Sequence, residues 1–355
     1  MRFLISGGGT GGHIFPAVSI ANALRELVPD CEILFVGALG RMEMERVPQA
    51  GYKIIGLPVR GFDRKRPWRN ISVMIDLMRS MRMVKKVIRE FKPDVAIGVG
   101  GYASGAAMKV AARMGIPVLL QEQNGFAGVT NKLLKNDAAR ICVAYENMDR
   151  FFPADKIILT GNPVRQNLTS GIKNEKLKIK TLLIIGGSLG ARTINEAIRA
   201  ALPELSKRDI QVVWQTGKTY YADCKAAWEA AGSPKNIECL DFLSDMPDRY
   251  AQADLVISRA GASSISELCL LGKAAILVPS PNVAEDHQTH NAMALVNKDA
   301  AVLVKDVEAK DKLVSTALDL LDDEARLSIL RKNILTLAQP DSARRIAEEV
   351  LKLVR

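Results

Sequence analysis

Short apolar segments that run directly into glycine-rich loops recur along this chain, and this pattern constrains the fold more than any other feature. Residues 2–6 precede the first such loop, residues 94–98 the second and residues 181–185 a third. Repeated succession of a strand, a glycine turn and a helix predicts a parallel, doubly wound α/β sheet. Loops at the carboxyl ends of such strands gather at one edge, where ligands bind.

The chain has 355 residues, which is too long for one ordinary core and suits two domains of roughly 150 to 200 residues. The glycine loop at 186–192 repeats the plan of the loop at 7–13, so we predict two Rossmann-like domains. We place the first domain at 1–163 and the second at 164–339, with the polar, lysine-rich residues 166–180 as the linker.

Composition narrows the class of protein. An apolar content of 48% with 25% charged residues is ordinary for a globular chain and argues against disorder. The five cysteines are scattered without C-x-x-C spacing, which suggests neither a disulfide framework nor a zinc site and favours the cytosol. No apolar stretch reaches the roughly 18 residues of a spanning helix, so we expect a soluble or peripheral protein. The net charge of +10 favours nucleic acid, phospholipid or phosphorylated partners.

The first glycine loop, GGGTGGH at 7–13, can bring backbone N–H groups and Thr10 close to a phosphate or another oxyanion. The motif G-x-G-x-x-G is present in residues 7–12, so an NAD or NADP site is the competing interpretation. The second strand, residues 33–36, runs into residues 37–40 without the acidic residue that would bind a ribose, which disfavours that alternative.

Three polar residues in the first half are candidates for chemistry. His13 ends the first glycine loop, and a near-neutral imidazole suits a general base; that it only shapes the loop stays open. Glu122 and Asn124 follow the strand at 117–120, so they are candidate substrate contacts. Ordinary turn chemistry is the alternative for both, because Asn-Gly is a common turn pair.

A donor pocket is predicted in the second half, after the strand at 254–258. We expect Ser263 or Ser264 to cap a helix whose first turn carries Glu267. Such a turn presents N–H groups to an anion and a carboxylate to the hydroxyls of a ribose. A plain capped helix with a solvated glutamate is the alternative.

Positive charge concentrates between residues 60 and 92, with eleven Lys or Arg residues against three acidic ones. Apolar residues recur there at helical spacing, and Phe62 and Trp68 lie in the basic loop that precedes them. A basic amphipathic segment of this kind can dock on anionic lipid. The alternative is an apolar stripe in the core beneath a solvated basic face. Nucleic-acid binding is disfavoured because aromatic residues that could stack on bases are few.

Seven motifs, in this order, resemble those of the MurG family: GGGTGGH at 7–13, GVGGY at 98–102, EQN at 122–124, GNPVR at 161–165, GGSLGA at 186–191, SRAGASSISE at 258–267 and DHQTHNA at 286–292. The family consists of peripheral bacterial transferases that add N-acetylglucosamine from its UDP donor to undecaprenyl-pyrophosphoryl-muramyl-pentapeptide. The resemblance implies a GT-B fold, two Rossmann-like domains facing across a cleft, with a last helix at about 340–355 that returns to the first domain.

The resemblance also implies roles for individual residues. His13 would be the catalytic base, with Glu122 second. The donor and acceptor would meet Thr10, Gly11, Gly12, Asn124, Arg165, Ser188, Leu243, Ala262, Ser263, Ser264, Ile265, Ser266, Glu267 and Gln288. The family often has histidine before the glutamate of EQN, whereas this chain has Gln121, so position 121 receives no catalytic role. No Asp-x-Asp pair is present to chelate a metal–diphosphate complex, so we expect neither a metal nor a cofactor.

The implied activity is an inverting hexosyl transfer to the muramyl 4-hydroxyl, which makes lipid II from lipid I in peptidoglycan synthesis. The implied partners are UDP-N-acetylglucosamine, the lipid-linked muramyl-pentapeptide and an anionic membrane surface, with no nucleic acid. The implied location is the cytoplasmic face of the inner membrane. A UDP-sugar 2-epimerase with the same two-domain plan is the alternative enzyme, and it would need no lipid acceptor.

Overall fold

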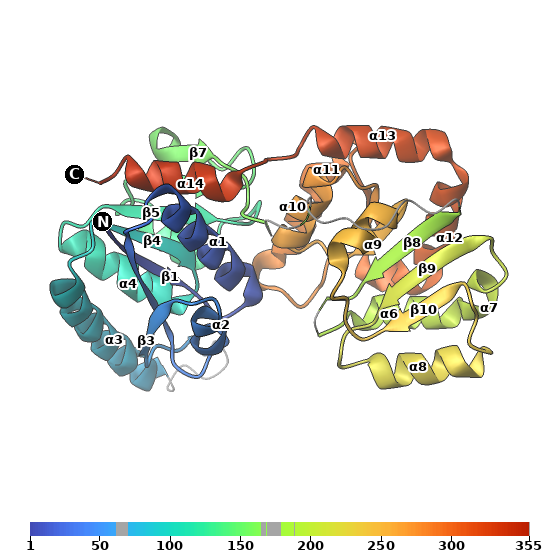
Figure 1. Cartoon of the computed structure of the whole chain (residues 1–355), viewed down its shortest axis with the longest axis horizontal. Coiled ribbons are helices and arrows are strands. Elements are labelled where there is room, and N and C mark those ends of the chain that lie inside the picture. Colours follow the sequence, from blue (N-terminus) through green and yellow to red (C-terminus); the bar gives the residue numbers. More distant parts are fainter. Residues whose placement is uncertain (62–69, 165–167, 169–178, 188, 355) are drawn as a thin grey trace. The chain divides into compact units, whose positions relative to one another are not determined.

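The computed structural model describes residues 1–61, 70–164, 168, 179–187 and 189–354 (Figure 1). The chain divides into two compact units: unit 1 is Met1–Val164 with Pro340–Arg355, and unit 2 is Arg165–Gln339. Each unit has its own parallel sheet and its own buried apolar core. None of the helices in the described ranges is long and apolar enough to cross a bilayer.

The described part of unit 1 contains a parallel sheet with the strand order β3-β2-β1-β4-β5-β6-β7. Its strands are β1 (Arg2–Gly7), β2 (Glu32–Ala38), β3 (Lys53–Leu57), β4 (Val95–Gly100), β5 (Val118–Glu122), β6 (Arg140–Val143) and β7 (Ile157–Leu159). Its α-helices are α1 (Gly11–Leu27), α2 (Glu43–Gln49), α3 (Asn70–Phe91), α4 (Tyr102–Arg113), α5 (Val129–Leu134) and α14 (Ser342–Leu351).

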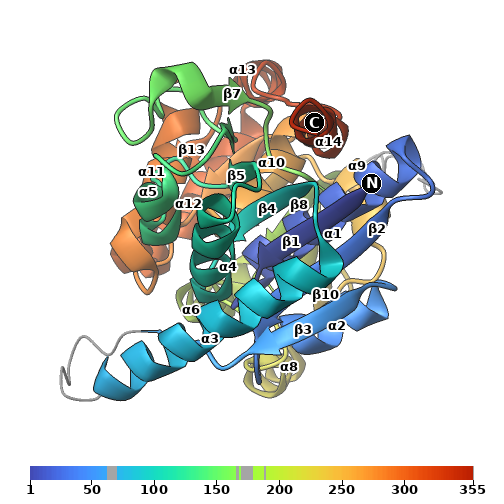
Figure 2. The same cartoon turned by 90° about the vertical axis from the view of Figure 1, so that its left-hand side faces the viewer.

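Alternation along the strands of unit 1 divides its core into two layers. Helices α3 and α4 lie on one face of the sheet, and α1 and α14 lie on the other (Figure 2). Leu4 of β1 packs with residues of α3 and α4, whereas Phe3 and Ile5 pack with α1 and α14. Successive side chains of a strand point to opposite faces, so a fully buried strand needs apolar residues on both. The run Phe3-Leu4-Ile5 meets that demand, because all three residues are completely buried.

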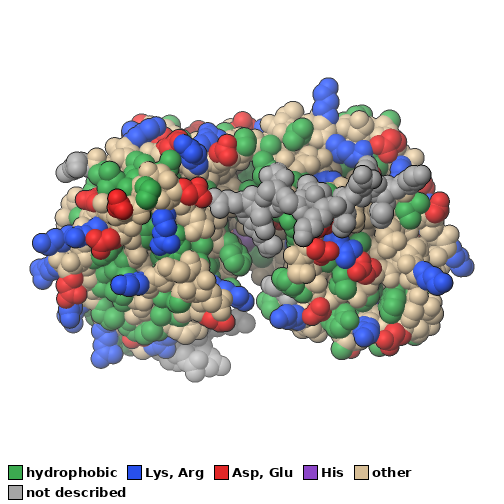
Figure 3. All heavy atoms as spheres, viewed as in Figure 1, with side chains coloured by type: hydrophobic (Ala, Val, Ile, Leu, Met, Phe, Trp, Pro, Cys, Tyr) green, Lys and Arg blue, Asp and Glu red, His purple; other side chains and the backbone are tan. Residues whose placement is uncertain are grey.

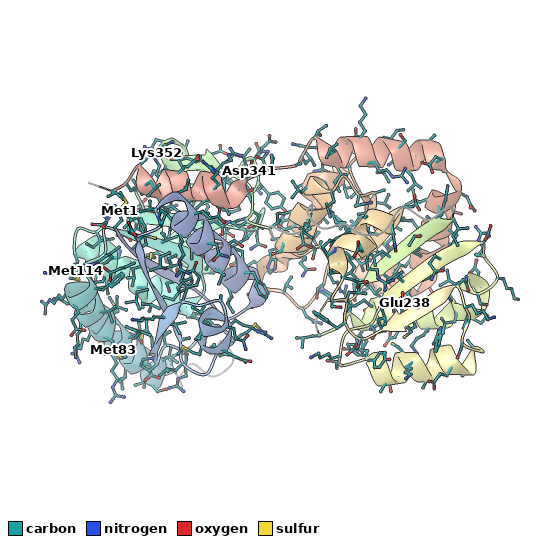
Figure 4. The ribbon with its side chains drawn as sticks, in the orientation of Figure 1. Met1, Met83, Met114, Glu238, Asp341 and Lys352 are labelled. Atoms are coloured by element: carbon teal, nitrogen blue, oxygen red, sulfur yellow. The ribbon has the colours of Figure 1, made fainter. Side chains whose placement is uncertain are left out.

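The C-terminal helix α14 belongs to unit 1, where Asp341 and Lys352 flank it (Figure 4). Ile346 on its inner face is completely buried in the layer that contains α1. Arg345 donates hydrogen bonds to the carbonyl oxygens of Leu159 at 2.6 Å and Thr160 at 3.4 Å. These contacts fix the end of the chain against the edge strand β7.

The described part of unit 2 contains a parallel sheet with the order β10-β9-β8-β11-β12-β13. Its strands are β8 (Lys180–Ile185), β9 (Ile210–Gln215), β10 (Ile237–Leu240), β11 (Leu255–Ser258), β12 (Ala275–Leu277) and β13 (Val302–Leu303). Its α-helices are α6 (Arg192–Ala200), α7 (Leu202–Leu205), α8 (Tyr221–Ala230), α9 (Met246–Gln252), α10 (Ala262–Leu270), α11 (His287–Val296), α12 (Ala309–Asp322) and α13 (Glu324–Leu335).

The predicted fold class, two doubly wound α/β domains, is confirmed. Strand order reverses between β1 and β4 in unit 1, and between β8 and β11 in unit 2. Ligands of such sheets bind outside the carboxyl ends of the strands at the reversal point. The glycine loops after β1 and β8 lie at these two points.

Two element ends bear on the candidate site. Helix α1 begins at Gly11, because the Thr10 carbonyl already accepts hydrogen bonds from the N–H groups of His13 and Ile14. His13 therefore lies in the first turn of α1. Strand β10 ends at Leu240, where its pairing with β9 stops, and residues 241–245 form a loop.

Candidate active site

The glycine loops after β1 and β4 touch in unit 1. The N–H of Gly8 donates to the carbonyl oxygen of Gly100 at 3.3 Å. A Cβ atom on Gly101 would lie 2.6 Å from the Gly8 carbonyl oxygen, and the φ of Gly101 is +93°. Only glycine combines that backbone conformation with such a close approach. Contact with the first loop thus explains the glycine at position 101 of GVGGY.

His13 lies between these two loops. Its Nδ1 is 3.0 Å from the Gly8 carbonyl oxygen and 3.3 Å from Oγ1 of Thr10. A carbonyl oxygen can only accept, so Nδ1 carries a proton, and the basic lone pair of the neutral ring is then on Nε2. A Cβ atom on Gly100 would lie 2.8 Å from Nε2, so the ring packs against the Gly100 backbone. A half-buried neutral imidazole in this tautomer can act as a Brønsted base through Nε2.

Glu122 organises the loop that follows β5. The side chain is 2% exposed, and Oε1 accepts from the backbone N–H of Asn124 at 3.1 Å and from its side-chain amide at 3.3 Å. Oε2 accepts from Gly128 N–H at 3.0 Å and from Nδ2 of Asn131 at 2.9 Å. Four donors converge on one carboxylate, so its geometry is that of a group that shapes the loop and orients Asn124.

In unit 2, Gln215 at the end of β9 joins two loops. Its Nε2 donates to the carbonyl oxygens of Gly187 and Asp241, both at 2.9 Å, and its Oε1 accepts from Gly187 N–H at 3.0 Å. The side chain is 4% exposed. The loop after β8 and the loop after β10 are therefore held together by one amide, which the loop motifs did not reveal.

The loop after β10 is also fixed by charge. Arg249 of α9 binds Glu238 through two nitrogens, at 2.5 and 3.1 Å, and binds Asp245 at 2.8 Å (Figure 4 labels Glu238). Burial lowers the pKa of the guanidinium, but hydrogen bonds to both carboxylates outweigh this effect and raise its pKa above the ordinary value. Leu243 lies in this loop with its side chain 4% exposed, so its backbone is the part that it can offer to a ligand.

The N-terminus of α10 follows β11 through Gly261. The helix's own hydrogen bonds begin with Ile265 N–H donating to the Gly261 carbonyl, so the N–H groups of residues 262–264 point out of the first turn. Asn291, which is completely buried in α11, donates to the Ala260 carbonyl at 3.2 Å and fixes the turn before the helix. A helix N-terminus of this kind can bind an anion through its backbone.

The capping prediction for this helix was wrong. Gly261 is the N-cap, and Ser263 and Ser264 are already inside the first turn, because the helix begins as soon as the chain leaves β11. Glu267 consequently lies in the second turn rather than the first. It is 8% exposed and accepts a hydrogen bond from the Tyr250 hydroxyl at 3.1 Å, so it is not a solvated glutamate.

Arg259 and Gln288 hold the loop after β12. Arg259 donates to the Val278 carbonyl at 3.1 Å and forms an ion pair with Asp306. Oε1 of Gln288 accepts from Ser280 N–H at 2.9 Å, so its amide nitrogen is the group that it can offer to a ligand.

The profile of the glycosyltransferase family 28 N-terminal domain matches residues 3–143, and that of the C-terminal domain matches residues 181–347. Curated proteins from Bacteroides thetaiotaomicron and Parabacteroides distasonis, both named UDP-N-acetylglucosamine--N-acetylmuramyl-(pentapeptide) pyrophosphoryl-undecaprenol N-acetylglucosamine transferase, are 60% and 58% identical to this chain. Each alignment covers 99% of this chain and 98% of the relative. The crystal structure of Acinetobacter baumannii MurG superposes with a TM-score of 0.82 at 28% identity over 99% of both chains.

The chain belongs to the MurG family. The resemblance seen in the seven motifs is thereby confirmed, and the two α/β units are those of the GT-B fold. A UDP-GlcNAc 2-epimerase from Neisseria meningitidis bound to UDP-GlcNAc superposes with a TM-score of 0.69 at 15% identity, over 99% of this chain and 100% of its own. That likeness extends to the fold alone.

Most of the positions predicted from the MurG motifs lie at two helix N-termini. Thr10 is the N-cap of α1, and Gly11 and Gly12 lie with His13 in its first turn. The predicted residues 262–266 form the N-terminal end of α10, and the buried Glu267 follows them. Arg165 and Ser188 lie outside the described residues.

The cysteines of this family member are free thiols. Burial raises the pKa of Cys224 to about 11 and the pKa values of Cys142, Cys239 and Cys269 to about 12, and it also raises the pKa of Cys31. All of them are protonated near neutral pH, whereas a nucleophilic cysteine acts as the thiolate. The raised pKa values disfavour the thiolate form that covalent catalysis by a cysteine needs.

Proposed function

We propose that this chain transfers N-acetylglucosamine from UDP-N-acetylglucosamine to the 4-hydroxyl of undecaprenyl-pyrophosphoryl-muramyl-pentapeptide. The observation that carries the proposal is the identity of about 60%, over essentially the whole length, to curated transferases named for this reaction. The acceptor hydroxyl oxygen forms a bond to the anomeric carbon from the face opposite the diphosphate, and the bond to the diphosphate oxygen breaks. The acceptor proton passes to a base, and UDP leaves with the bonding electron pair.

His13 is the base in this proposal. Its Nδ1 proton is engaged by the Gly8 carbonyl, which puts the lone pair on Nε2. Glu122 is the second candidate, but its two oxygens already accept four hydrogen bonds from its own loop and from Asn131. Geometry therefore favours His13, with Glu122 orienting Asn124 toward the sugar. Thr10, Gly11 and Gly12 would meet the sugar and diphosphate side of the substrates.

The donor nucleotide binds unit 2 in this proposal. The Leu243 backbone would meet uracil, Glu267 would accept from the ribose hydroxyls, and Gln288 would contact the sugar. The phosphates would lie against Ala262, Ser263, Ser264, Ile265 and Ser266, with Arg165 and Ser188 contributing from outside the described residues. Support comes from the outward N–H groups of α10, because a helix N-terminus stabilises the negative charge that develops on departing UDP.

The membrane surface of the proposal is the N-terminal part of α3. Ile71 is 70% exposed, Met78 50%, and Met74 and Ile75 45% each. Basic residues follow on the same helix, with Arg79, Arg82, Lys85 and Lys86 all exposed. Figure 3 shows apolar and basic side chains together on the surface of unit 1. Exposed large apolar residues beside Lys and Arg suit an anionic membrane interface.

The helices around this surface add apolar area to it. An apolar cavity of about 360 Å³ is lined by residues of α3, α4 and α5, among them Leu77, Ala106 and Leu134. Leu133 is 74% exposed and Tyr102 56% exposed at its rim. The basic loop residues predicted to join this surface, Phe62, Arg64, Lys65, Arg66, Trp68 and Arg69, lie outside the described residues. We propose peripheral attachment to the cytoplasmic face of the inner membrane.

Product analysis tests the proposed reaction. The purified chain is incubated with UDP-N-acetylglucosamine and the lipid-linked muramyl-pentapeptide, and the lipid fraction is analysed by mass spectrometry. We expect the acceptor to gain one N-acetylhexosamine residue. Conversion of the donor sugar to its 2-epimer, with the acceptor unchanged, would favour the epimerase instead.

A further inference from the structure

Glu43 is a buried carboxylate that binds the first glycine loop, residues 7–13. It is the first residue of α2 and is completely buried. Its Oε1 accepts from Ala38 N–H at 3.0 Å, and its Oε2 accepts from Gly9 N–H at 2.9 Å. An ionised carboxylate only accepts hydrogen bonds, which matches two N–H donors. A Cβ atom on Gly8 would lie 2.1 Å from Oε1, so the carboxylate packs directly against the first glycine loop.

The peptide group that Glu43 binds is the one that holds His13. The N–H of Gly9 and the carbonyl of Gly8 belong to the same peptide unit. Glu43 accepts from its N–H end at 2.9 Å, and Nδ1 of His13 donates to its carbonyl end at 3.0 Å. A peptide unit is planar, so fixing the direction of its N–H also fixes the direction of its carbonyl. The carboxylate, the peptide and the imidazole thus form one hydrogen-bonded chain.

This chain has an electrostatic consequence. Hydrogen bonds in series polarise one another, and a charged acceptor makes a shorter and stronger bond than a neutral one. Across the described parts of the chain Glu43 has no ion pair, so its charge acts on the two peptide groups that it binds. The Gly8 carbonyl becomes a stronger acceptor for the His13 proton.

We propose that Glu43 is a positioning residue, which acts through the Gly8–Gly9 peptide to hold His13 in the Nδ1-protonated tautomer with Nε2 as the base. The inference rests on the proposed function for its kinetic consequence, whereas the tautomer of His13 is a property of the protein without substrate. Glu43 itself touches no reacting atom.

The test variant is Glu43→Gln, which keeps the size of the side chain. Its amide has one oxygen and one NH₂ group, so one of the two backbone N–H groups must face another donor. If packing were the only role of Glu43, this variant would keep nearly full turnover. We expect turnover to fall by up to about 100-fold, with the KM for the UDP donor unchanged, because a misplaced base costs rate and not donor binding.

A double-mutant cycle with His13→Ala isolates the pathway. If Glu43 acts through His13, Glu43→Gln has little further effect on turnover when the imidazole is absent. An equal loss of turnover in the wild-type and His13→Ala backgrounds overturns the proposal.

Nitrogen NMR of the histidine side chains gives a readout that needs no activity. The chain has three histidines, so His287 and His290 serve as internal references. We expect His13 to be protonated on Nδ1 in the wild type and to populate both tautomers in Glu43→Gln. Asp254→Asn is the matched control, because Asp254 belongs to unit 2, is 4% exposed and accepts from the Thr181 backbone N–H at 2.9 Å.

The NMR result tests the positioning role of Glu43 separately from the proposed transfer reaction. A changed His13 tautomer in Glu43→Gln, with no change in Asp254→Asn, supports the positioning role even if the transfer reaction were assigned wrongly. An unchanged His13 tautomer in a folded Glu43→Gln protein overturns it, whatever the activity assay gives.

Discussion

Buried polar side chains hold the loops that the glycines shape. Glu43, Glu122 and Gln215 each bind backbone groups of a loop at the carboxyl end of a strand, and each is at most 4% exposed. Glycine loops lack side chains that could satisfy their own backbone, and a buried backbone group without a partner is costly. At the scale of the residue, these three side chains allow the loops to keep one shape before a ligand arrives.

Glu267 gives the first residue-scale prediction. Glu267→Ala should weaken binding of UDP-N-acetylglucosamine by about 1–3 kcal/mol, because the ribose hydroxyls lose a charged acceptor in a buried setting. Isothermal calorimetry measures the change. Glu229→Ala, an exposed glutamate of α8, is the control and should bind the donor as the wild type does. Unchanged affinity in Glu267→Ala would remove this carboxylate from the donor site.

His13 gives the second. His13→Ala should lower turnover by about 10²–10⁴-fold with little change in donor affinity, since a general base acts mainly in the transition state. His13→Asn keeps an N–H donor for the Gly8 carbonyl but has no basic nitrogen, so it should stay slow. Steady-state kinetics compare the two variants. Near wild-type turnover in His13→Asn would mean that the imidazole only shapes the loop, and Glu122 would become the leading candidate.

Sequence reasoning reached the residues of the site unevenly. Glycine spacing predicts where backbone approaches a ligand or another loop, and His13 stands out because histidines are few. Glu43 and Gln215 were missed, because the loops that they join, at Gly9, Gly187 and Asp241, are 26 to 34 residues away in the sequence and no local pattern encodes these contacts. The N-cap of α10 was also predicted wrongly. Serine is a favoured N-cap, but the helix begins soon after β11, so Gly261 is the N-cap and both serines lie inside the first turn.

At the scale of the element, α14 completes the core of unit 1 from the far end of the sequence. The resemblance to the MurG family predicted that a last helix, at about 340–355, packs on the first domain. The sequence pattern of this segment alone does not identify its packing partner. Its buried face joins the layer formed by α1. Both doubly wound sheets, in contrast, follow from local strand and loop patterns that agree with the global topology.

Removing the contact between α14 and α1 should destabilise unit 1. Ile346→Ala should lower the free energy of unfolding of unit 1 by about 2–5 kcal/mol, because the side chain is completely buried and leaves a cavity. Hydrogen exchange of α1 peptides, followed in urea, reports the change. Ile329→Ala on α13, where the side chain is 45% exposed, should change stability by less than about 0.5 kcal/mol. Wild-type protection of α1 in Ile346→Ala would contradict this packing.

The exposed end of α3 gives a second element-scale prediction. Replacing Ile71, Ile75 and Met78 by serine should weaken binding to anionic vesicles by about 100-fold. Burying one such side chain stabilises by about 1.5–3 kcal/mol, and these are about half exposed in solution. Sedimentation with vesicles measures binding, and donor affinity should not change. Serine at the exposed Ile329 and Leu335 of α13 is the control; equal loss in both variants would show that the surface of α3 is not special.

At the scale of the whole molecule, the positive net charge is consistent with the proposed reaction on a lipid-linked acceptor. In the proposed function, the net charge of +10 would draw the chain toward an anionic membrane surface, where a lipid-linked acceptor is concentrated. Unit 1 carries the proposed base and the exposed surface of α3, and unit 2 carries the proposed donor site. A transferase needs both substrates at once, whereas an epimerase of similar fold needs only the nucleotide sugar.

Release of UDP with and without the acceptor tests this account most directly. The initial rate is measured with UDP-N-acetylglucosamine alone and then with the lipid-linked muramyl-pentapeptide added in vesicles. The account predicts that UDP release depends on the acceptor and stops when one UDP has formed for each acceptor molecule added. Release of UDP at the same rate in the absence of the acceptor would contradict it.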